Sequence, residues 1–187
     1  MENTPFIRQT IPADLDAVMQ IYTAARAEMA ATGNPHQWGD SHPPRAMIEA
    51  DIDAGKSYVL VDETNGNDAA YPRRIRAVFY FAIEDDPTYA EIDGAWLDVD
   101  VPYGVVHRIA RAPGAKGAGA ACLAWCFGQC GNIRIDTMAA NASMHKLLVR
   151  LGYKRCGVIR LGLFDDPAMD ERIAYQKTEP RAAKEGN

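Results

Sequence analysis

Hydrophobic residues recur with a helical period early in the chain and in short continuous runs around that stretch. The helical stripe consists of Leu15, Val18, Met19, Tyr22, Ala25 and Met29. It predicts an amphipathic helix that starts near Pro12 and stops at Gly33, because proline is tolerated in a first helical turn and glycine often follows a last one. A shorter stripe predicts a second helix over 44–54. Apolar runs predict strands over 6–9, 57–61 and 75–83.

The second half of the chain alternates strand and helix patterns. Strands are predicted over 104–111, 133–138, 153–163 and 172–176, and helices over 117–129 and 142–151. The order strand 104–111, helix 117–129, strand 133–138 predicts a right-handed crossover that joins two parallel strands. The acidic segment 84–102 has no clear period, and we expect it to hold only a short strand or turn near Trp96.

These elements together predict a mixed α/β fold. The strands 57–61 and 75–83 are expected to form a hairpin across a polar surface turn at 63–74, and two strand–helix units follow them. We expect residues 1–180 to form one domain and the charged segment 181–187 to be a disordered tail.

Composition narrows the functional class. The 187 residues are 48% hydrophobic and 24% charged, as in an average soluble globular protein, which excludes a disordered chain, a coiled coil and a collagen-like fibre. The net charge of -5 argues against a general nucleic-acid binder, because phosphate neutralisation favours basic proteins. No apolar run reaches the ~18 residues of a membrane span, and residues 1–10 have no secretion-signal pattern. We expect a cytoplasmic monomer or homodimer with no nucleic-acid or membrane partner.

Three of the four cysteines, Cys122, Cys126 and Cys130, are spaced to lie on one helix face. Structural zinc sites usually combine two close ligand pairs. The remaining Cys156 completes no second pair, and no pair of histidines does so either. We therefore expect buried, reduced thiols and no metal.

The segment 111–121, RAPGAKGAGAA, carries the clearest chemical signal. Gly114, Gly117 and Gly119 can bring the backbone close to a ligand, and the helix that follows offers unpaired amide groups and a positive dipole end. This combination predicts an anion site for a phosphate or pyrophosphate, to which Lys116 adds a positive charge. The segment matches neither the Walker loop nor the dinucleotide-binding GxGxxG motif. A glycine-rich turn without a ligand is the alternative.

These segments, in this order, resemble the GNAT acetyltransferases. The pyrophosphate loop of that family reads Q/R-x-x-G-x-G/A, and here it reads GAKGAG over 114–119, with glycine in place of the first Gln or Arg. The family's next motif is an asparagine that opens a helix, followed by a Gly-aromatic pair, and here these are Asn141 and Gly152-Tyr153. The resemblance covers about residues 5–177 and is to a bacterial subgroup of mostly unassigned substrate. It implies about seven strands, four helices and two central strands that splay apart.

The resemblance implies that acetyl-CoA is the cosubstrate and binds in the gap between strands 104–111 and 133–138. Its pantetheine arm would pair with the backbone of the first strand like an added strand, and Asn141 would contact it from the other side. Lys146 or Lys116 would meet the 3′-phosphate. The remaining cofactor-binding residues implied are Ile109, Ala110 and Arg111 for the arm, and Lys116, Gly117, Ala118, Gly119 and Ala120 for the pyrophosphate.

Direct attack of an amine on the thioester needs a base. His107 is the leading candidate because histidine changes charge near neutral pH, and a buried, hydrogen-bonded structural histidine is the alternative. Tyr103, Glu84 and Asp85 are further candidates for the base or for holding a water molecule. We expect Arg108 to point to the opposite face from His107 and to form an ion pair with Asp136 on the adjacent strand.

Many GNAT relatives carry a tyrosine as the acid for the thiolate seven residues after the motif asparagine, but here that position is Leu148. Tyr153 is expected to be a packing aromatic. The resemblance places the acceptor, a primary amine of a small molecule or peptide, beside Trp38 and His36, although Trp38 can equally be a cap over the core. The acidic stretch 84–100 is either a solvated loop or a field that favours a cationic amine. A CoA-binding module without turnover and an unrelated α/β phosphate-binding protein remain alternatives.

Overall fold

The computed structural model describes residues 5–62 and 74–179. Within these residues one sheet has the strand order β1-β2-β3-β5-β6-β8-β7-β4. The strands are β1 (Phe6–Gln9), β2 (Ser57–Val61), β3 (Ile75–Ile83), β4 (Asp93–Gly94), β5 (Gly104–Arg111), β6 (Asn132–Thr137), β7 (Lys154–Arg160) and β8 (Glu171–Thr178). The helices are α1 (Leu15–Ala31), α2 (Arg45–Asp53), α3 (Ala118–Cys130), α4 (Ala142–Arg150) and α5 (Pro167–Asp170), with short 3₁₀ turns at Pro12–Asp14 and Pro87–Tyr89.

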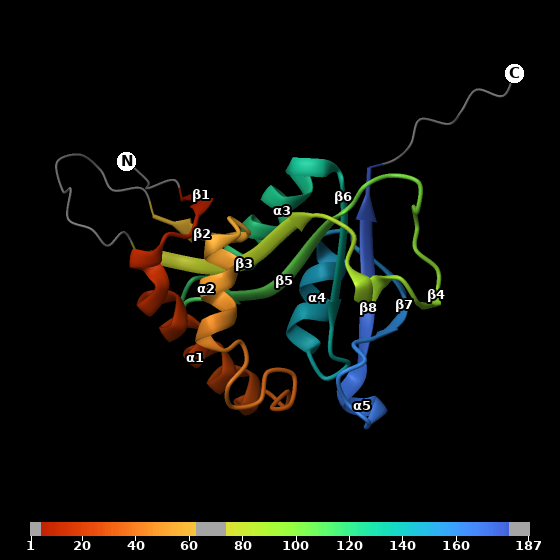
Figure 1. Cartoon of the computed structure of the whole chain (residues 1–187), viewed down its shortest axis with the longest axis horizontal. Helices are drawn as coiled ribbons and strands as arrows, with labels where there is room; N and C mark the ends of the chain where they lie inside the picture. The colour runs from red at the N-terminus through yellow and green to blue at the C-terminus, as the bar shows by residue number, and fades with distance from the viewer. Residues whose placement is uncertain (1–4, 63–73, 180–187) are drawn as a thin grey trace, which may run out of the picture.

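Helices cover both faces of the sheet (Figure 1) because the strand residues alternate between two apolar layers. On one face, Val59 and Val78 pack with residues of α1 and α2. On the other face, the neighbouring Leu60 and Phe79 pack with residues of α3 and α4. A smaller core around Tyr89 fills the space beside β7 and β8. Among the described residues, no helix combines the length and apolar character needed to cross a bilayer.

The mixed α/β fold class is confirmed, and so are the antiparallel pairing of β2 with β3 and the parallel pairing of β5 with β6. Two small elements exceed the expected number, namely α5 and the two-residue β4. The strand expected near Trp96 lies slightly earlier, where Gly94 meets Gly157 of β7. A Cβ on Gly94 would lie 2.2 Å from the carbonyl oxygen of Cys156, so only glycine permits this close pairing. The tail 181–187 and nearly all of the polar turn 63–74 lie outside the described residues.

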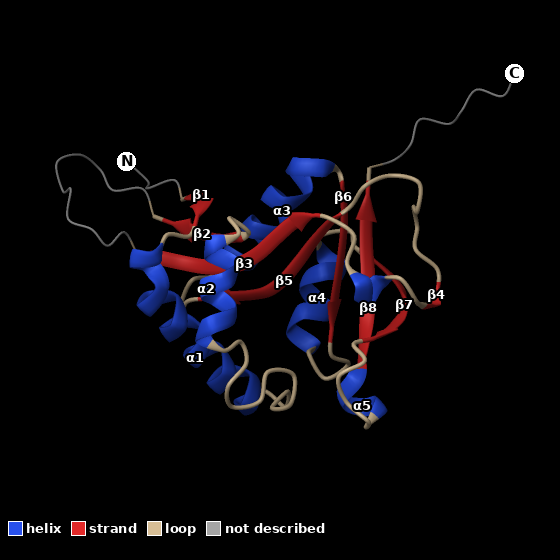
Figure 2. Ribbon diagram, viewed as in Figure 1, coloured by secondary structure: helices blue, strands red, loops and turns tan. Residues whose placement is uncertain are grey.

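The central feature of the fold is the divergence of β5 from β6. The two strands pair only at Gly104–Ile133 and Val105–Arg134. Beyond these pairs the strands separate, as Figure 2 shows, while β5 stays paired with β3 on its other side. The expected splaying of the central strands is therefore present. It leaves backbone groups on the β6-facing edge of β5 without partners from β6.

Candidate active site

Two cavities open along the gap between β5 and β6. The larger one, which we call the polar cleft, has a volume of about 550 Å³ and is lined by His107, Asp86, Asp136 and Arg172 among others. The smaller one, the narrow groove, has a volume of about 250 Å³ and lies between α1, the end of β5 and the starts of α3 and α4. Both cavities are lined by Met29, Ile109, Asn141 and Met144. A molecule that lies along the gap can therefore reach from one cavity into the other.

The narrow groove meets the glycine-rich loop at the start of α3. Gly117 adopts φ +79°, a left-handed conformation that favours glycine, and α3 begins at the next residue. The first amide of this helix with a helical bond belongs to Ala121, which donates to the Gly117 carbonyl at 3.1 Å. The amides of Gly119 and Ala120 have no backbone acceptor in the described part of the chain. This arrangement suits an anionic group such as a pyrophosphate.

The other residues expected to bind a cofactor are placed unequally. Ile109, Ala110, Arg111, Gly119 and Asn141 line the narrow groove. Ala118 is buried, and Lys116 and Lys146 are exposed outside the lining of either cavity. The two lysines can therefore meet only a group that extends out of the groove.

A β-bulge in β5 shapes the polar cleft. Val78 of β3 pairs with Ala110 and Tyr80 pairs with His107, so β5 contains one more residue than β3 across this interval. Arg108 lies in the bulge with φ +50°, a conformation that is uncommon outside glycine. The bulge breaks the alternation of side chains along the strand.

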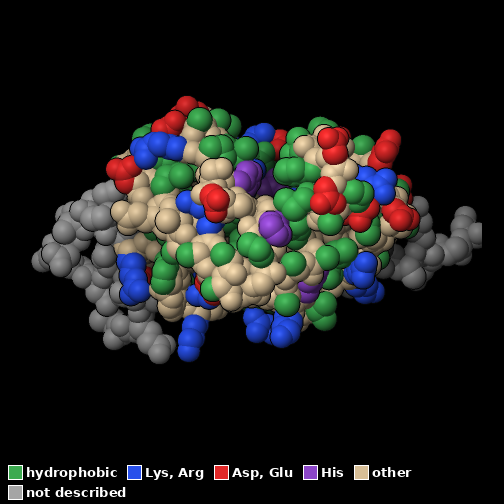
Figure 3. Space-filling model, turned by 90° about the horizontal axis from the view of Figure 1, so that it is seen from below, with side chains coloured by type: hydrophobic (Ala, Val, Ile, Leu, Met, Phe, Trp, Pro, Cys, Tyr) green, Lys and Arg blue, Asp and Glu red, His purple; other side chains and the backbone are tan. Residues whose placement is uncertain are grey.

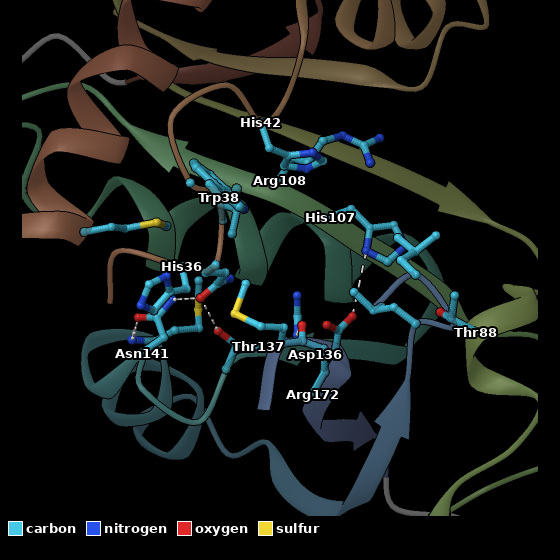
Figure 4. Close-up of a pocket in the computed structure, with 18 of the residues that line it drawn as sticks. His36, Trp38, His42, Thr88, His107, Arg108, Asp136, Thr137, Asn141 and Arg172 are labelled. Atoms are coloured by element: carbon cyan, nitrogen blue, oxygen red, sulfur yellow. Dashed lines mark hydrogen bonds and ion pairs between the residues drawn. The ribbon is translucent and has the colours of Figure 1, made fainter. Parts of the chain in front are cut away.

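The bulge corrects two expectations about Arg108. His107 and Arg108 do not point to opposite faces, because both line the polar cleft (Figure 4). The expected ion pair between Arg108 and Asp136 is also wrong. Arg108 instead binds Asp51 of α2 at 2.8 Å, and its guanidinium lies 4.8 Å from the ring centre of Tyr80.

His107 is held between two carboxylates. Its Nε2 lies 2.7 Å from Oδ2 of Asp86, and its Nδ1 lies 4.0 Å from Oδ1 of Asp136. Burial opposes ionisation of Asp86, but hydrogen bonds from His107 and Thr88 outweigh it and lower the pKa of Asp86 to about 2. Since an ionised carboxylate only accepts, Nε2 carries the proton and Nδ1 keeps a lone pair when the ring is neutral. The second distance is too long for a hydrogen bond, so Nδ1 is available to a bound molecule.

The other three candidates, Glu84, Asp85 and Tyr103, do not line either cavity. Glu84 is bound by Lys56 at 2.5 Å and by the hydroxyl of Tyr80. Tyr103 is buried, and its hydroxyl accepts a hydrogen bond from the Asp86 amide at 3.0 Å. The structure thus places Tyr103 behind Asp86, where it holds the backbone of that residue.

The loop between α1 and α2 forms one wall of the polar cleft. His36 and Trp38 both line it. Trp38 also packs edge-on against Tyr22 with ring centres 5.6 Å apart and is only 8% exposed, so it serves both the core and the cleft wall. Gln37 ties this loop across the gap, because its Oε1 accepts from Nδ2 of Asn141 at 2.9 Å.

Arg172 is a cleft residue that the sequence analysis did not single out, and Asp86 was considered there only as one member of the acidic stretch 84–100. Asp86 caps the turn that follows it, where it accepts from the amide of Thr88 at 2.8 Å, and the sequence Asp-Pro-Thr is a recognisable signal for such a turn. Arg172 opens the predicted strand 172–176 and directly precedes the run Ile173-Ala174-Tyr175, which was an available signal for a buried cation. Among the acidic residues of 84–100, only Asp86 lines the polar cleft.

Figure 3 shows histidine side chains at the centre of the face that is seen from below. Apolar side chains surround them, and acidic side chains gather on the right of the same view. The centre of this face therefore combines groups that can exchange protons with an apolar setting.

Two of the three helical cysteines are buried as expected, whereas Cys130 is only half-buried and its thiol donates to the Asn132 carbonyl at 3.1 Å. Cys122 and Cys126 are fully buried, and burial raises the pKa of Cys122 to about 12. Among the described residues, no group of three or more His, Cys, Asp or Glu side chains is arranged to hold a metal ion.

No family model matches the chain, and no curated protein matches it either. A solved GNAT acetyltransferase from Streptococcus agalactiae is 30% identical and superposes with a TM-score of 0.73 over 95% of this chain and 96% of its own. A GNAT acetyltransferase from Listeria monocytogenes is 16% identical, with a TM-score of 0.63 over 92% of this chain and 94% of its own. The phosphinothricin acetyltransferase of Sinorhizobium meliloti, solved with AcCoA, is 18% identical, with a TM-score of 0.60 over 97% and 92%. The likeness to the streptococcal protein extends over nearly the whole length of both chains, and this chain belongs to the GNAT family of acetyltransferases.

Proposed function

We propose that the protein moves an acetyl group from acetyl-CoA to a primary amine by direct attack. The observation that carries this proposal is the continuity of the narrow groove and the polar cleft across the gap between β5 and β6. One cavity adjoins a helix start that suits a pyrophosphate, and the other contains an imidazole with a free nitrogen. The relative from Sinorhizobium meliloti was solved with AcCoA, which supports this cosubstrate.

The narrow groove offers acetyl-CoA two kinds of contact. Backbone groups of Ile109 and Arg111 on the open edge of β5 would pair with the pantetheine arm as an additional strand would. The amides at the start of α3, including those of Gly119 and Ala120, would bind the pyrophosphate. Acetyl-CoA would supply the thioester that the amine attacks. Acetylation needs no metal in this scheme, because the backbone amides of β5 can stabilise negative charge on the carbonyl oxygen.

His107 is the proposed base. Its Nδ1 faces the space beside Asp136, 4.0 Å from that carboxylate, so an ammonium that binds Asp136 can transfer a proton to the ring. Asp86 holds the proton of Nε2 and stabilises the imidazolium that results, as a carboxylate partner does in other acid–base pairs. Nδ1 therefore accepts the proton of the amine, while Nε2 binds the carboxylate that stabilises the charged ring.

The acid for the departing thiolate is not a tyrosine in this proposal. Leu148, at the family's tyrosine position, is fully buried in the core. No tyrosine is among the described residues that line either cavity. This observation favours a second candidate function, in which the chain binds acetyl-CoA without transferring its acetyl group.

Two measurements separate the candidates. Calorimetry with acetyl-CoA should show micromolar to sub-millimolar binding, and absence of binding at millimolar concentration would contradict both functions. A thiol-release assay with a panel of primary amines should then show acetyl-CoA consumption that depends on the amine. Binding without amine-dependent release would instead support the non-catalytic module.

A further inference from the structure

Arg172 is a buried cation that forms no direct ion pair with a carboxylate among the described residues. It lies on β8, is 5% exposed and lines the polar cleft. One guanidinium nitrogen, Nη1, donates to the carbonyl groups of Met169 at 2.7 Å and Glu171 at 2.9 Å. The other two nitrogens have no hydrogen-bond partner and no ion pair within the described residues. A buried arginine normally binds a carboxylate or phosphate, so this one indicates an anionic ligand group in the cleft.

Two carboxylates, Asp136 and Asp170, act electrostatically on Arg172, but each is hydrogen-bonded to other groups and neither forms an ion pair with it. Both oxygens of Asp170 accept from backbone amides of the loop that follows β7, at 3.1 Å from Gly162 and at 2.8 Å from Leu163. Asp136 accepts from the hydroxyl of Tyr89 at 2.8 Å and forms no ion pair with Arg172. The second arginine of the cleft, Arg108, is already bound to Asp51. Of the two arginines among the described residues that line the cleft, Arg172 is therefore the one without a direct carboxylate partner, and it is available to a ligand.

Negative and positive groups lie next to each other on one face of the sheet. Asp136 of β6 is paired in register with Ala174 of β8, two residues from Arg172. Residues two apart on a strand share a face, and diagonal neighbours on adjacent strands are within reach of long side chains. Figure 4 shows Asp136 and Arg172 beside each other below His107. The cleft thus presents a carboxylate with an imidazole on one side and a guanidinium on the other.

We propose that the acceptor is a free α-amino acid, whose ammonium lies between Asp136 and His107 and whose carboxylate binds Arg172. This inference rests on the proposed acetyl transfer, and it names the substrate class of that same site. The adjacent charges of the cleft match the adjacent charges of a zwitterion. A guanidinium also binds a carboxylate through two parallel hydrogen bonds, which fixes the orientation of the amine.

The wall beside Arg172 indicates an apolar side chain on the amino acid. Leu161, Leu163, Phe164 and Met169 line the cleft there. Leu163 is 74% exposed and Phe164 is 47% exposed, so a side chain that covers them would remove apolar surface from water. An amino acid at the N-terminus of a peptide has no carboxylate next to its amine, and the proposal therefore excludes peptides as preferred acceptors.

The first test uses the unaltered protein. Acetyl transfer is measured with L-leucine, L-methionine and L-phenylalanine, and with the carboxamide of each, which keeps the amine and loses the charge. The best amino acid should exceed its carboxamide in kcat/KM by about 10- to 100-fold, as expected for loss of a charged hydrogen bond. Equal rates for acids and carboxamides, or transfer to carboxamides alone, would overturn the inference while leaving the acetyltransferase function intact.

The second test compares Arg172→Gln and Arg172→Lys with a matched control, Arg160→Gln. Arg160 is an exposed arginine of β7 outside the lining of the polar cleft, and its partner Glu171 precedes Arg172 on β8. Arg172→Gln should abolish the preference for acids over carboxamides, Arg172→Lys should keep part of it, and Arg160→Gln should keep all of it. A preference that survives in folded Arg172→Gln protein would refute the role of Arg172. Should that variant not fold, the comparison of acids with carboxamides still decides the question.

A third readout separates this inference from the proposed function. Calorimetric titration of the protein–CoA complex with each amino acid and its carboxamide measures recognition without turnover. Tighter binding of the acid together with no transfer to any amine would refute the acetyltransferase function and support the recognition of a carboxylate. Equal binding of the two would refute that recognition whether or not transfer occurs.

Discussion

The hydrogen bond between His107 and Asp86 gives a prediction with a defined dependence on pH. Burial opposes the charge of Asp86, but hydrogen bonds from His107 and Thr88 lower its pKa from 3.8 to about 2. Its side chain is only 14% exposed, so solvent screens the pair weakly. At ~1.4 kcal/mol per pKa unit, the ionised carboxylate stabilises the fold by about 2 kcal/mol. Asp86→Asn should lower the free energy of unfolding at pH 7 by about that amount.

The sign of the pH dependence follows from the lowered pKa. The stabilisation is complete above the ordinary value of 3.8 and is lost as the pH falls through about 2. Urea unfolding, followed by tryptophan fluorescence at a series of pH values from 7 downward, measures the free-energy difference between the variant and the unaltered protein. The free-energy difference should shrink steadily as the pH falls below 3.8, the ordinary pKa of this carboxyl group.

The exposed neighbour Asp85 provides the matched control. Asp85→Asn should leave the free energy of unfolding within about 0.5 kcal/mol of the unaltered protein, as is usual for surface changes. The reasoning would be refuted if Asp86→Asn were as stable as the control at pH 7. It would also be refuted if the loss of stability were the same at every pH, because a packing defect does not titrate.

Three further predictions concern the base, the groove and the thiols. His107→Ala should reduce kcat by about 100-fold or more with unchanged affinity for acetyl-CoA by calorimetry, and an unchanged kcat would remove His107 as the base. In Gly119→Val, the new Cβ would lie 3.3 Å from Cδ2 of Leu147, and the methyl groups of the valine would enter the narrow groove. Calorimetry should therefore show that the affinity for acetyl-CoA is reduced about 10-fold or more. Burial raises the pKa of the thiols of Cys122 and Cys126, so both should resist iodoacetamide in the native protein at pH 8 and react in urea. Mass spectrometry of the modified peptides measures this difference, and labelling of the native protein at the rate seen in urea would contradict the burial of the two thiols.

Hydrophobic periodicity predicted the elements whose interior faces are long and regular. The helix predicted over 142–151 is observed as Ala142–Arg150, and the strand predicted over 104–111 is Gly104–Arg111. Periodicity could not predict β4, because two residues contain no period and the pairing depends on close approach of Gly94 to Gly157. It also could not show that β8 lies between β6 and β7, since strand order depends on tertiary packing.

The site was predictable where local chemistry determines it. Glycines before a helix start indicate an anion site by themselves, and the structure places Gly117 in the left-handed conformation at that position. The surroundings of His107 were not predictable in the same way. Asp86 is 21 residues away in sequence, and its contact with the imidazole depends on how the turn after β3 folds back over β5.

The bulge at Arg108 explains both the failed prediction and the shape of the cleft. A residue in this conformation costs on the order of 1–3 kcal/mol and persists only where its surroundings fix it. Here Asp51 binds the guanidinium at 2.8 Å, Tyr80 stacks on it, and the hydroxyl of Tyr22 donates to the Arg108 carbonyl at 3.0 Å. Because Tyr22 lies on α1 and Asp51 on α2, these helices determine the course of β5 at the gap. Some of the residues that shape the cleft, Tyr22 and Asp51 among them, therefore do not line it. The hydrophobic pattern of β5 alone could not identify them.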